Sequence, residues 1–291
     1  MPLRIGYVRE HFSSPLLQYA DQDKGKTFTL VECPSGTGQL INRLTNDEID
    51  VAIALTDPLI SGIANGSTAY KLVGSYVSTP LNWAVITGKD SKYNSISDLR
   101  NTTLGISRHG SGSETMAYVM AFQQGWTTND MKFKVNNDIR GLVASVNDDS
   151  SSAFMWEWFT TKPWLDKGEV RFIGAVPTPW PSWTIAAKTT APSEELKQFL
   201  ATLSTYVKDF DSEESRTEKN IPFIKQRFGY KEEDIQAWLK TVKYPEDCLK
   251  LDRKVIEDTL DVLKKAQVIK TEPEGGFKVE DFVSSNVANL V

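Results

Sequence analysis

The chain has few of the residues that hold metals or perform hydrolysis. Its 291 residues include two cysteines, Cys33 and Cys248, and two histidines. The cysteines lie far apart and lack a metal-ligand spacing, so we expect two buried free thiols and no metal site. Neither a Gly-x-Ser-x-Gly elbow nor a phosphate-binding Gly-x-x-x-x-Gly-Lys motif occurs. A binding protein without a cofactor is therefore favoured over an enzyme, and we assign no catalytic residue.

The sequence also lacks basic blocks and long apolar runs. Its net charge is -5, with acidic and basic residues interspersed, which disfavours nucleic acid as a partner. No apolar run approaches the roughly 20 residues of a membrane span, so we expect no membrane insertion. The N-terminus enters a strand without a signal-peptide pattern. This predicts a cytoplasmic protein if that end is native, and an extracytoplasmic one if a signal peptide has been removed.

What the sequence does contain is an alternation of strands and helices. Residues 3–8, 27–33 and 50–55 are predicted strands with helical segments between them, which is a βαβ pattern. The run DVAIAL at 50–55 is typical of a parallel strand buried on both faces. The chain after Lys188 is predicted to be nearly all helical.

Two long extended segments interrupt this alternation. Lys71–Lys89 and Val170–Lys188 are each too long for an ordinary strand and are broken by prolines. We interpret them as hinge strands that join two lobes. The first lobe then comprises residues 1–82 and 183–291, including the C-terminal helices, and the inserted second lobe comprises 83–182. The cleft between two such lobes is the expected ligand site.

The most informative stretch runs from Ser91 to Trp126. It predicts a strand, TLGIS, then the glycine-serine loop RHGSGS, then a long helix. Free backbone N–H groups at the start of such a helix can bind an acceptor atom of a small ligand. The alternative is an ordinary helix start, in which Ser111 or Ser113 caps the helix and Glu114 suits its dipole.

Three segments together carry a family resemblance. The strand DVAIAL ending at Thr56, the hinge strand LNWAVITG and the phrase ISDLRNTTLGISRHGSGSE resemble the type 2 periplasmic-binding-protein fold, with Asn101 where a glycine is usual. The resemblance covers roughly residues 1–210. It implies an α/β, two-lobed, periplasmic binding protein-like type II fold with an inter-lobe cleft, here with C-terminal helices. It is closest to solute-binding proteins for alkanesulfonates, nitrate or thiamine pyrimidine precursors. A transporter partner stays open.

The same fold also hosts enzymes, which keeps an alternative open. These include the futalosine enzymes of the menaquinone pathway and the fungal thiamine-pyrimidine synthases. The synthases carry a cysteine-rich iron-binding motif, and this sequence has nothing like it. An enzyme on this fold, such as a futalosine-type enzyme, is therefore the main alternative to a binding protein, ahead of an interaction or regulatory protein that keeps the fold without ligand turnover.

Ligands of open α/β sheets bind at the C-terminal ends of strands. Glu10 and the segment Phe154–Trp158 lie at such positions. The strand ends and hinges supply these candidate ligand-binding residues: His11, Gly36, Thr37, Thr56, Ser78, Asn82, Ser107, His109, Gly110, Ser111, Gly112, Glu157, Trp180 and Trp183. Five of the eight tryptophans lie between residues 156 and 183, and we expect two of the five to line the cleft.

The charges at these positions indicate the type of ligand. Arg108 is the one basic residue of the glycine-serine loop, whereas Glu10, Glu114 and Glu157 lie in or beside the candidate segments. This balance disfavours sulfonate or nitrate. It suits a small planar heterocycle with an amino group, such as a thiamine pyrimidine precursor, because a carboxylate accepts from the amino group while an indole stacks on the ring.

Two points about single residues stay open. Glu157 is either a buried carboxylate or an exposed glutamate at a helix start. His11 and His109 fall in one predicted cleft loop of each lobe. They either face each other across the closed cleft or are solvated loop residues.

Overall fold

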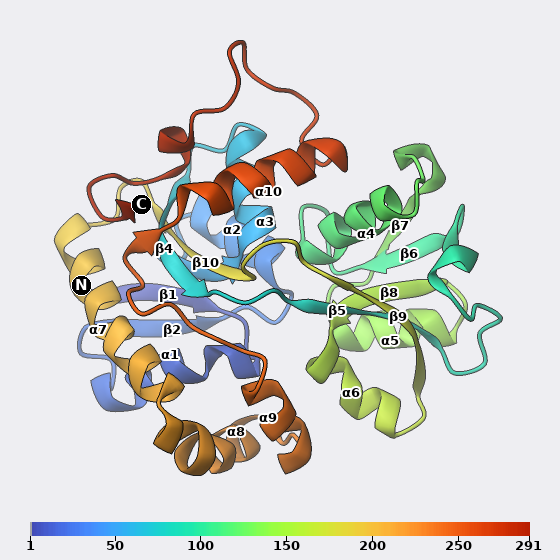
Figure 1. Ribbon diagram of the computed structural model, residues 1–291, viewed down its shortest axis with the longest axis horizontal. Coiled ribbons are helices and arrows are strands. Elements are labelled where there is room, and N and C mark those ends of the chain that lie inside the picture. Colours follow the sequence, from blue (N-terminus) through green and yellow to red (C-terminus); the bar gives the residue numbers. More distant parts are fainter. Residues whose placement is uncertain (1) are drawn as a thin grey trace.

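The strands form two sheets of five strands each (Figure 1). The computed structural model describes residues 2–291. One sheet has the order β2-β1-β3-β10-β4 and the other β7-β6-β8-β5-β9. Their strands are β1 (Leu3–Tyr7), β2 (Phe28–Glu32), β3 (Val51–Leu55), β4 (Tyr70–Val77), β5 (Asn82–Gly88), β6 (Thr103–Ile106), β7 (Lys132–Val135), β8 (Ala153–Glu157), β9 (Val170–Pro177) and β10 (Trp183–Lys188). The predicted α/β class is confirmed.

Both sheets are built on one plan. In each, three strands run parallel, and a strand delivered by a hinge segment pairs with them antiparallel. That strand is β10 in the first sheet, between β3 and β4, and β5 in the second sheet, between β8 and β9. The two predicted hinge segments therefore each supply one strand to each sheet. On this basis we treat residues 83–182 as a lobe inserted into the other lobe.

The two hinge crossings are hydrogen-bonded to each other. The backbone N–H of Leu81 donates to Thr178 Oγ1 at 3.0 Å, and the N–H of Thr178 returns a bond to the Leu81 carbonyl at 2.9 Å. The N–H of Ser182 donates to the Thr79 carbonyl at 3.0 Å. Because the crossings bond to each other, the ends of β5 and β10 are held side by side at the junction of the lobes.

Helices connect the parallel strands of each sheet. They are α1 (Ser14–Asp23), α2 (Thr37–Thr45) and α3 (Thr56–Ala64) in the first lobe, and α4 (Gly112–Gln123), α5 (Ile139–Asn147) and α6 (Trp158–Asp166) in the second. Helices α2, α3, α4 and α6 begin within a few residues of a strand end. Their N-termini therefore gather where the strands end, at the junction between the lobes (Figure 1).

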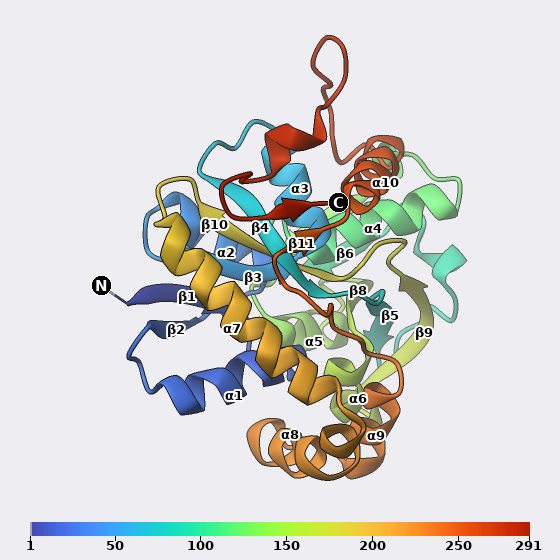
Figure 2. The same ribbon diagram turned by 60° about the vertical axis from the view of Figure 1, so that its left-hand side comes forward.

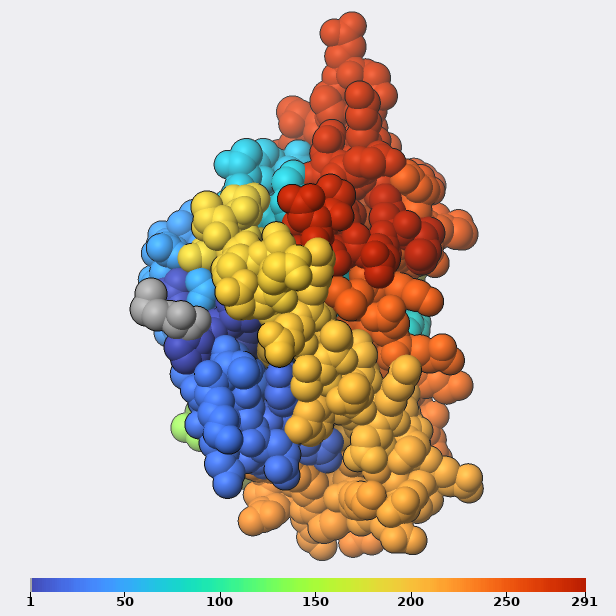
Figure 3. Space-filling model, turned by 90° about the vertical axis from the view of Figure 1, so that its left-hand side faces the viewer, coloured from blue at the N-terminus to red at the C-terminus, as the bar shows by residue number. Residues whose placement is uncertain are grey.

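The C-terminal helices are α7 (Ser193–Asp211), α8 (Asn220–Phe228), α9 (Glu232–Leu239) and α10 (Arg253–Lys265). Helix α7 packs on α1, and both lie on the face seen in Figure 3, whereas α10 contacts both α3 and α4 (Figure 2). Shorter elements are η1 (His11–Ser13), η2 (Ile96–Leu99), η3 (Thr128–Asp130), η4 (Ser215–Lys219), η5 (Val279–Phe282), β11 (Lys250–Leu251) and β12 (Asn289–Leu290). The C-terminal part is therefore mainly helical, with one small sheet.

The C-terminal part touches the second lobe on two sides. Near α9, Asp234 pairs with Lys162 of α6 at 3.2 Å, and Lys231 pairs with Asp166 at 2.7 Å. Beyond α10, Gln267 Oε1 accepts a hydrogen bond from the Thr128 hydroxyl at 3.0 Å. The C-terminal helices therefore bridge the lobes outside the hinge.

The two cysteines are buried and free, as predicted. Among residues 2–291, no helix has both the length and the apolar character needed to cross a membrane.

Candidate functional site

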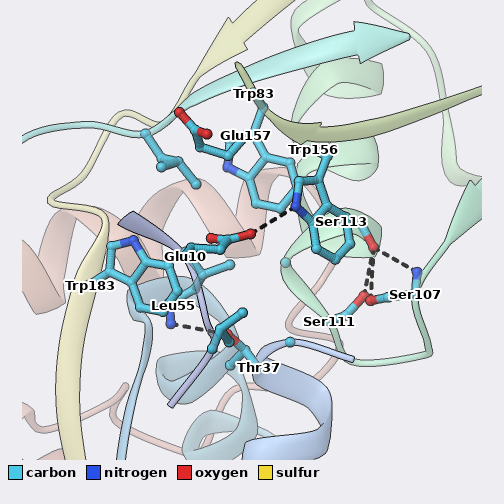
Figure 4. Close-up of a pocket in the computed structure, with 14 residues that line it drawn as sticks. Glu10, Thr37, Leu55, Trp83, Ser107, Ser111, Ser113, Trp156, Glu157 and Trp183 are labelled. Atoms are coloured by element: carbon cyan, nitrogen blue, oxygen red, sulfur yellow. Dashed lines mark hydrogen bonds between the residues drawn. The ribbon is translucent and has the colours of Figure 1, made fainter. Parts of the chain in front are cut away.

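A narrow pocket lies where the strand ends of the two sheets meet (Figure 4). Its lining residues come from both lobes and from the hinge: Val8, Glu10, Gly36, Thr37, Leu55, Leu81, Trp83, Ser107, Ser111, Gly112, Ser113, Trp156, Glu157 and Trp183. Indole and aliphatic walls with a few converging polar groups are the usual composition of a small-molecule site. This pocket is therefore the candidate functional site.

The β2–α2 turn supplies one wall of the pocket. Gly36 has a φ of 75°, a backbone conformation that favours glycine, and it directly precedes the first residue of α2, Thr37. The Thr37 hydroxyl accepts a hydrogen bond from the Leu55 N–H at 3.1 Å. This bond fixes the start of α2 against the end of β3 and places both residues in the lining.

The glycine-serine loop between β6 and α4 supplies the opposite wall. Ser111 is the N-cap of α4, and its hydroxyl accepts from the Glu114 N–H, so the predicted cap is confirmed. Ser113 Oγ accepts from the Ser107 N–H at 3.0 Å and lies 2.9 Å from Ser111 Oγ. We call Ser107, Ser111 and Ser113 the serine cluster. Its hydroxyls are buried and bonded to one another, so the loop is held by its own hydrogen bonds.

Glu10 follows β1 and reaches into the pocket (Figure 4). It is buried, and Glu10 Oε1 accepts from Trp156 Nε1 at 2.9 Å. The glutamate belongs to the first lobe and the tryptophan to β8 of the second, so this bond crosses the cleft. Burial raises the pKa of Glu10 to about 7, and the bond from Trp156 opposes that rise.

Glu157 ends β8 and is buried, which settles the open question about its exposure. It is also the N-cap of α6: its carboxylate accepts from the Thr160 N–H at 2.7 Å and from the Thr160 hydroxyl at 3.0 Å. Burial raises the pKa of Glu157 to about 8, and the nearby charge of Glu10 raises it further. Both carboxyls of the pocket therefore favour a proton near neutral pH.

His11 lies behind the pocket rather than in its lining. Its ring is surrounded by aromatic side chains: Phe12, Phe159, Tyr230 and Trp238. Neither ring nitrogen has a hydrogen-bond partner among the described residues, and Nε2 lies 3.7 Å from Glu157 Oε2. Burial lowers the pKa of His11 to about 3, so the ring is neutral near neutral pH.

The indoles of Trp83 and Trp183 also line the pocket. Both Nε1 atoms are buried and have no hydrogen-bond partner within residues 2–291. An unpaired buried donor is costly, so these groups favour a ligand with acceptor atoms. Of the five tryptophans between residues 156 and 183, Trp156 and Trp183 line the pocket.

Half of the predicted site residues lie in the lining: Gly36, Thr37, Ser107, Ser111, Gly112, Glu157 and Trp183. The other seven lie outside it: His11, Thr56, Ser78, Asn82, His109, Gly110 and Trp180. The predicted contacts of these seven with the pocket are not seen in this conformation.

Physical reasons are visible for five of these seven residues. The Thr56 hydroxyl donates to the Pro181 carbonyl at 2.6 Å, and the Ser78 hydroxyl to the Lys243 carbonyl at 3.0 Å. Trp180 Nε1 donates to Asp57 at 3.3 Å. The polar atoms of these three side chains therefore form hydrogen bonds within the protein near the hinge, not with the pocket.

The structure also explains why the two histidines lie outside the lining. His109 is exposed and pairs with Glu114, its Nδ1 lying 2.7 Å from Oε1, whereas His11 is enclosed by aromatic rings. They do not face each other across the cleft, because one points to solvent and the other is buried behind Glu157.

The residues that sequence reasoning missed are apolar or lie beside predicted ones. Val8, Leu55, Leu81 and Trp83 line the pocket without having been singled out. The sequence could have indicated them only by their position, since each lies within a residue or so of a strand end. Among residues 2–291, no three His, Cys, Asp or Glu side chains are placed to hold a metal ion.

Comparison with known proteins identifies relatives of this chain. A family model described as "Ca3427-like PBP" matches residues 83–176. The CA3427 gene product of Candida albicans, described as defining a new family with the generic periplasmic binding protein fold, is 32 % identical, with a TM-score of 0.90, over 100 % of this chain and 98 % of that one. No curated protein matches this sequence.

More distant structures share the fold. The alkanesulfonate-binding protein SsuA of Xanthomonas axonopodis pv. citri, bound to MOPS, is 17 % identical, with a TM-score of 0.76, over 100 % of this chain and 98 % of that one. The aliphatic sulphonate binding protein SsuA of Escherichia coli is 16 % identical, with a TM-score of 0.68, over 99 % and 93 %. The chain therefore belongs to the family that the Candida albicans CA3427 gene product defines, whose periplasmic binding protein fold supports a solute-binding role.

Proposed function

We propose that the chain binds a small planar solute that carries an amino group, of the class of thiamine pyrimidine precursors. The observation that carries this proposal is the pairing of indole walls with two buried carboxyls in one pocket. A planar ring can stack on the flat face of an indole, and an amino group donates to a carboxylate.

The polar groups of the pocket match the two kinds of atom on such a ring. Glu10 and Glu157 are acceptors when ionised, which suits an amino group. The unpaired Nε1–H groups of Trp83 and Trp183 are donors, which suits ring nitrogens or a hydroxyl oxygen. An aminopyrimidine carries both kinds of atom on one flat frame.

The same groups disfavour an anionic ligand such as a sulfonate. Arg108, the one basic residue of the glycine-serine loop, is not part of the lining. Its side chain packs so closely on α2 that a Cβ at Gly38 would lie 2.6 Å from Arg108 Cδ. The carboxyls, by contrast, do line the pocket, and each of them repels a sulfonate whenever it is ionised.

Titration calorimetry tests the proposal. We expect heat of binding with an aminopyrimidine and none with methanesulfonate. Binding of methanesulfonate alone would overturn the proposal. The bound aminopyrimidine should be recovered unchanged, and its conversion would favour the alternative of an enzyme on this fold.

A pair of matched variants locates the site. Trp83→Phe removes an indole of the lining, whereas Trp158→Phe makes the same change on α6 outside the lining. We expect the first variant to weaken aminopyrimidine binding several-fold, on the order of a lost hydrogen bond, and the second to leave it unchanged. Equal effects of both variants would place the ligand elsewhere.

A further inference from the structure

The pocket contains two buried carboxyls that no lysine or arginine of the described chain neutralises, and we call Glu10 and Glu157 the carboxyl pair. Glu10 comes from the first lobe and Glu157 from the second, with exposures of 8 % and 4 %. Among residues 2–291, no lysine or arginine lies within salt-bridge distance of either, and His11 is the nearest basic group, at 3.7 Å from Glu157. An uncompensated buried charge is costly, so these carboxyls have a reason to hold a proton.

The groups that face this pair are polar or titratable but uncharged. Trp156 donates to Glu10, and Thr160 of α6 donates twice to Glu157. Burial raises the pKa of Tyr230, just before α9, and both carboxylates raise it further. The charged groups of these helices, Lys162, Asp166, Lys231 and Asp234, pair with one another on the outside.

His11 does not supply the missing positive charge. It packs among aromatic rings, which keep water away from both nitrogens. Its lowered pKa leaves it neutral, while burial raises the pKa values of Glu10 and Glu157, so these carboxyls tend to hold a proton near neutral pH. A positive charge in this pocket must therefore come from the ligand.

We propose that the ligand binds as a cation, a ring-protonated amino heterocycle held by Glu10 and Glu157, and that it displaces the proton which this pair otherwise holds. The O–H bond of one carboxyl breaks and its proton passes to the buffer. The N–H groups of the cation then donate charge-assisted hydrogen bonds to the carboxylates. The inference rests on the proposed function only in assuming a small planar ring.

Two ring compounds of the same shape separate charge from shape. The para isomer of aminopyridine is a cation at neutral pH, and aniline is its neutral counterpart. By calorimetry we expect the aminopyridinium ion to bind on the order of tenfold more tightly than aniline, because hydrogen bonds to charged groups are stronger. Its affinity should rise from about pH 6 to about pH 8, as the pair loses its proton.

Proton release is measured directly by repeating the titration in two buffers with different ionisation enthalpies. The difference in heat gives the number of protons released, and we expect on the order of one per aminopyridinium bound. Glu157→Gln and Glu10→Gln should each reduce both the release and the preference for the cation. Glu32→Gln removes an exposed carboxylate at the end of β2, outside the lining, and should change neither.

The outcomes distinguish this inference from the proposed function. If aniline and the aminopyridinium ion bind equally, or the cation binds without proton release, the inference is wrong while a planar-ring site stands. If neither ring compound nor an aminopyrimidine binds, the proposed function has failed. If the glutamine variants retain the preference for the cation, the charge is recognised elsewhere.

Discussion

Two loops at the ends of equivalent strands show opposite ways of using polar residues. The loop after β1 carries Glu10 and His11, and the loop after β6 carries the serine cluster and His109. In sequence both are short polar segments with one histidine, placed between a strand and a helix. In the structure, the first is buried with unpaired ring nitrogens, and the second bonds to itself and exposes its histidine.

This difference indicates which of the two loops distinguishes one ligand from another. The serine cluster has hydroxyls that are already bonded, so a ligand gains little by replacing those bonds. The loop after β1 places a carboxyl and a histidine in an apolar setting, where a change of charge has a large energetic effect. We therefore expect the serine cluster to shape the pocket and the β1 loop to respond to ligand charge and to pH.

The largest expected effect is the loss of the aromatic enclosure around His11. Trp238 of α9 is buried, with ring centroids 4.5 Å from His11 and 5.4 Å from Phe12. Trp238→Ala should lower the free energy of unfolding by about 3–5 kcal/mol, measured by urea denaturation. Phe122→Ala on α4, beyond the serine cluster, removes a ring that is 46 % exposed and should cost at most about 0.5 kcal/mol. Similar losses would remove the contrast between the loops.

The next effect is the pH dependence that His11 brings. Its pKa is lowered from 6.5 to about 3 by burial, so the unfolded chain binds the extra proton between these values. Above about pH 6.5, His11 is neutral in both states and does not change the free energy of unfolding with pH. As the pH falls from about 6.5 toward about 3, the free energy of unfolding decreases, because only the unfolded chain takes up the proton. His11→Phe removes that loss. When the pH is lowered from about 7.5 to about 5, the free energy of unfolding of the His11→Phe variant should therefore increase by about 1–2 kcal/mol relative to that of the unaltered protein.

The comparison of the two proteins at both pH values cancels other groups. Glu10 and Glu157 have raised pKa values, so their contribution has the opposite sign: it is present at low pH and is lost as the pH rises toward about 8. Both glutamates are present in each protein. A difference between the proteins that does not change with pH would show that His11 titrates normally and is not enclosed.

The serine cluster should show a smaller, pH-independent effect. Ser113→Ala removes the acceptor of the buried Ser107 N–H and the partner of the Ser111 hydroxyl. We expect a loss of about 1 kcal/mol in the free energy of unfolding. Ser78→Ala, which removes one hydroxyl bond to the Lys243 carbonyl near the hinge, is the matched control and should cost less. A larger loss in the control would mean that the cluster is not the ordered element of the loop.

The fold could be predicted from the sequence because its signals are local. Within the predicted strand DVAIAL, Val51–Leu55 form β3, which is buried along its whole length. Pro80 lies between β4 and β5, and Pro179 and Pro181 lie between β9 and β10. Ser111 caps α4, as its position before the helix indicates. Each of these features depends on residues a few positions apart, so one sequence suffices to find them.

The site was only half predictable because its remaining features come from distant segments. Nothing near His11 in the sequence indicates that Tyr230 and Trp238, more than two hundred positions away, enclose it. Nothing local indicates that the hydroxyl of Thr56 is taken by the Pro181 carbonyl across the hinge. The apolar wall, such as Leu55, has the same pattern as core residues, so periodicity alone does not separate the two.

The smallest expected effect belongs to the other histidine. The His109 side chain is 71 % exposed, and its Nδ1 lies 2.7 Å from Glu114, which also accepts from the Gly110 N–H. Because Glu114 keeps that backbone donor and stays at the start of α4, His109→Ala should change the free energy of unfolding by less than about 0.5 kcal/mol. Affinity for an aminopyrimidine should also be unchanged, since His109 lies outside the lining. A tenfold or greater loss of affinity, on the order of 1.4 kcal/mol, would mean that this loop folds over the bound ligand and that the two loops are more alike than the structure indicates.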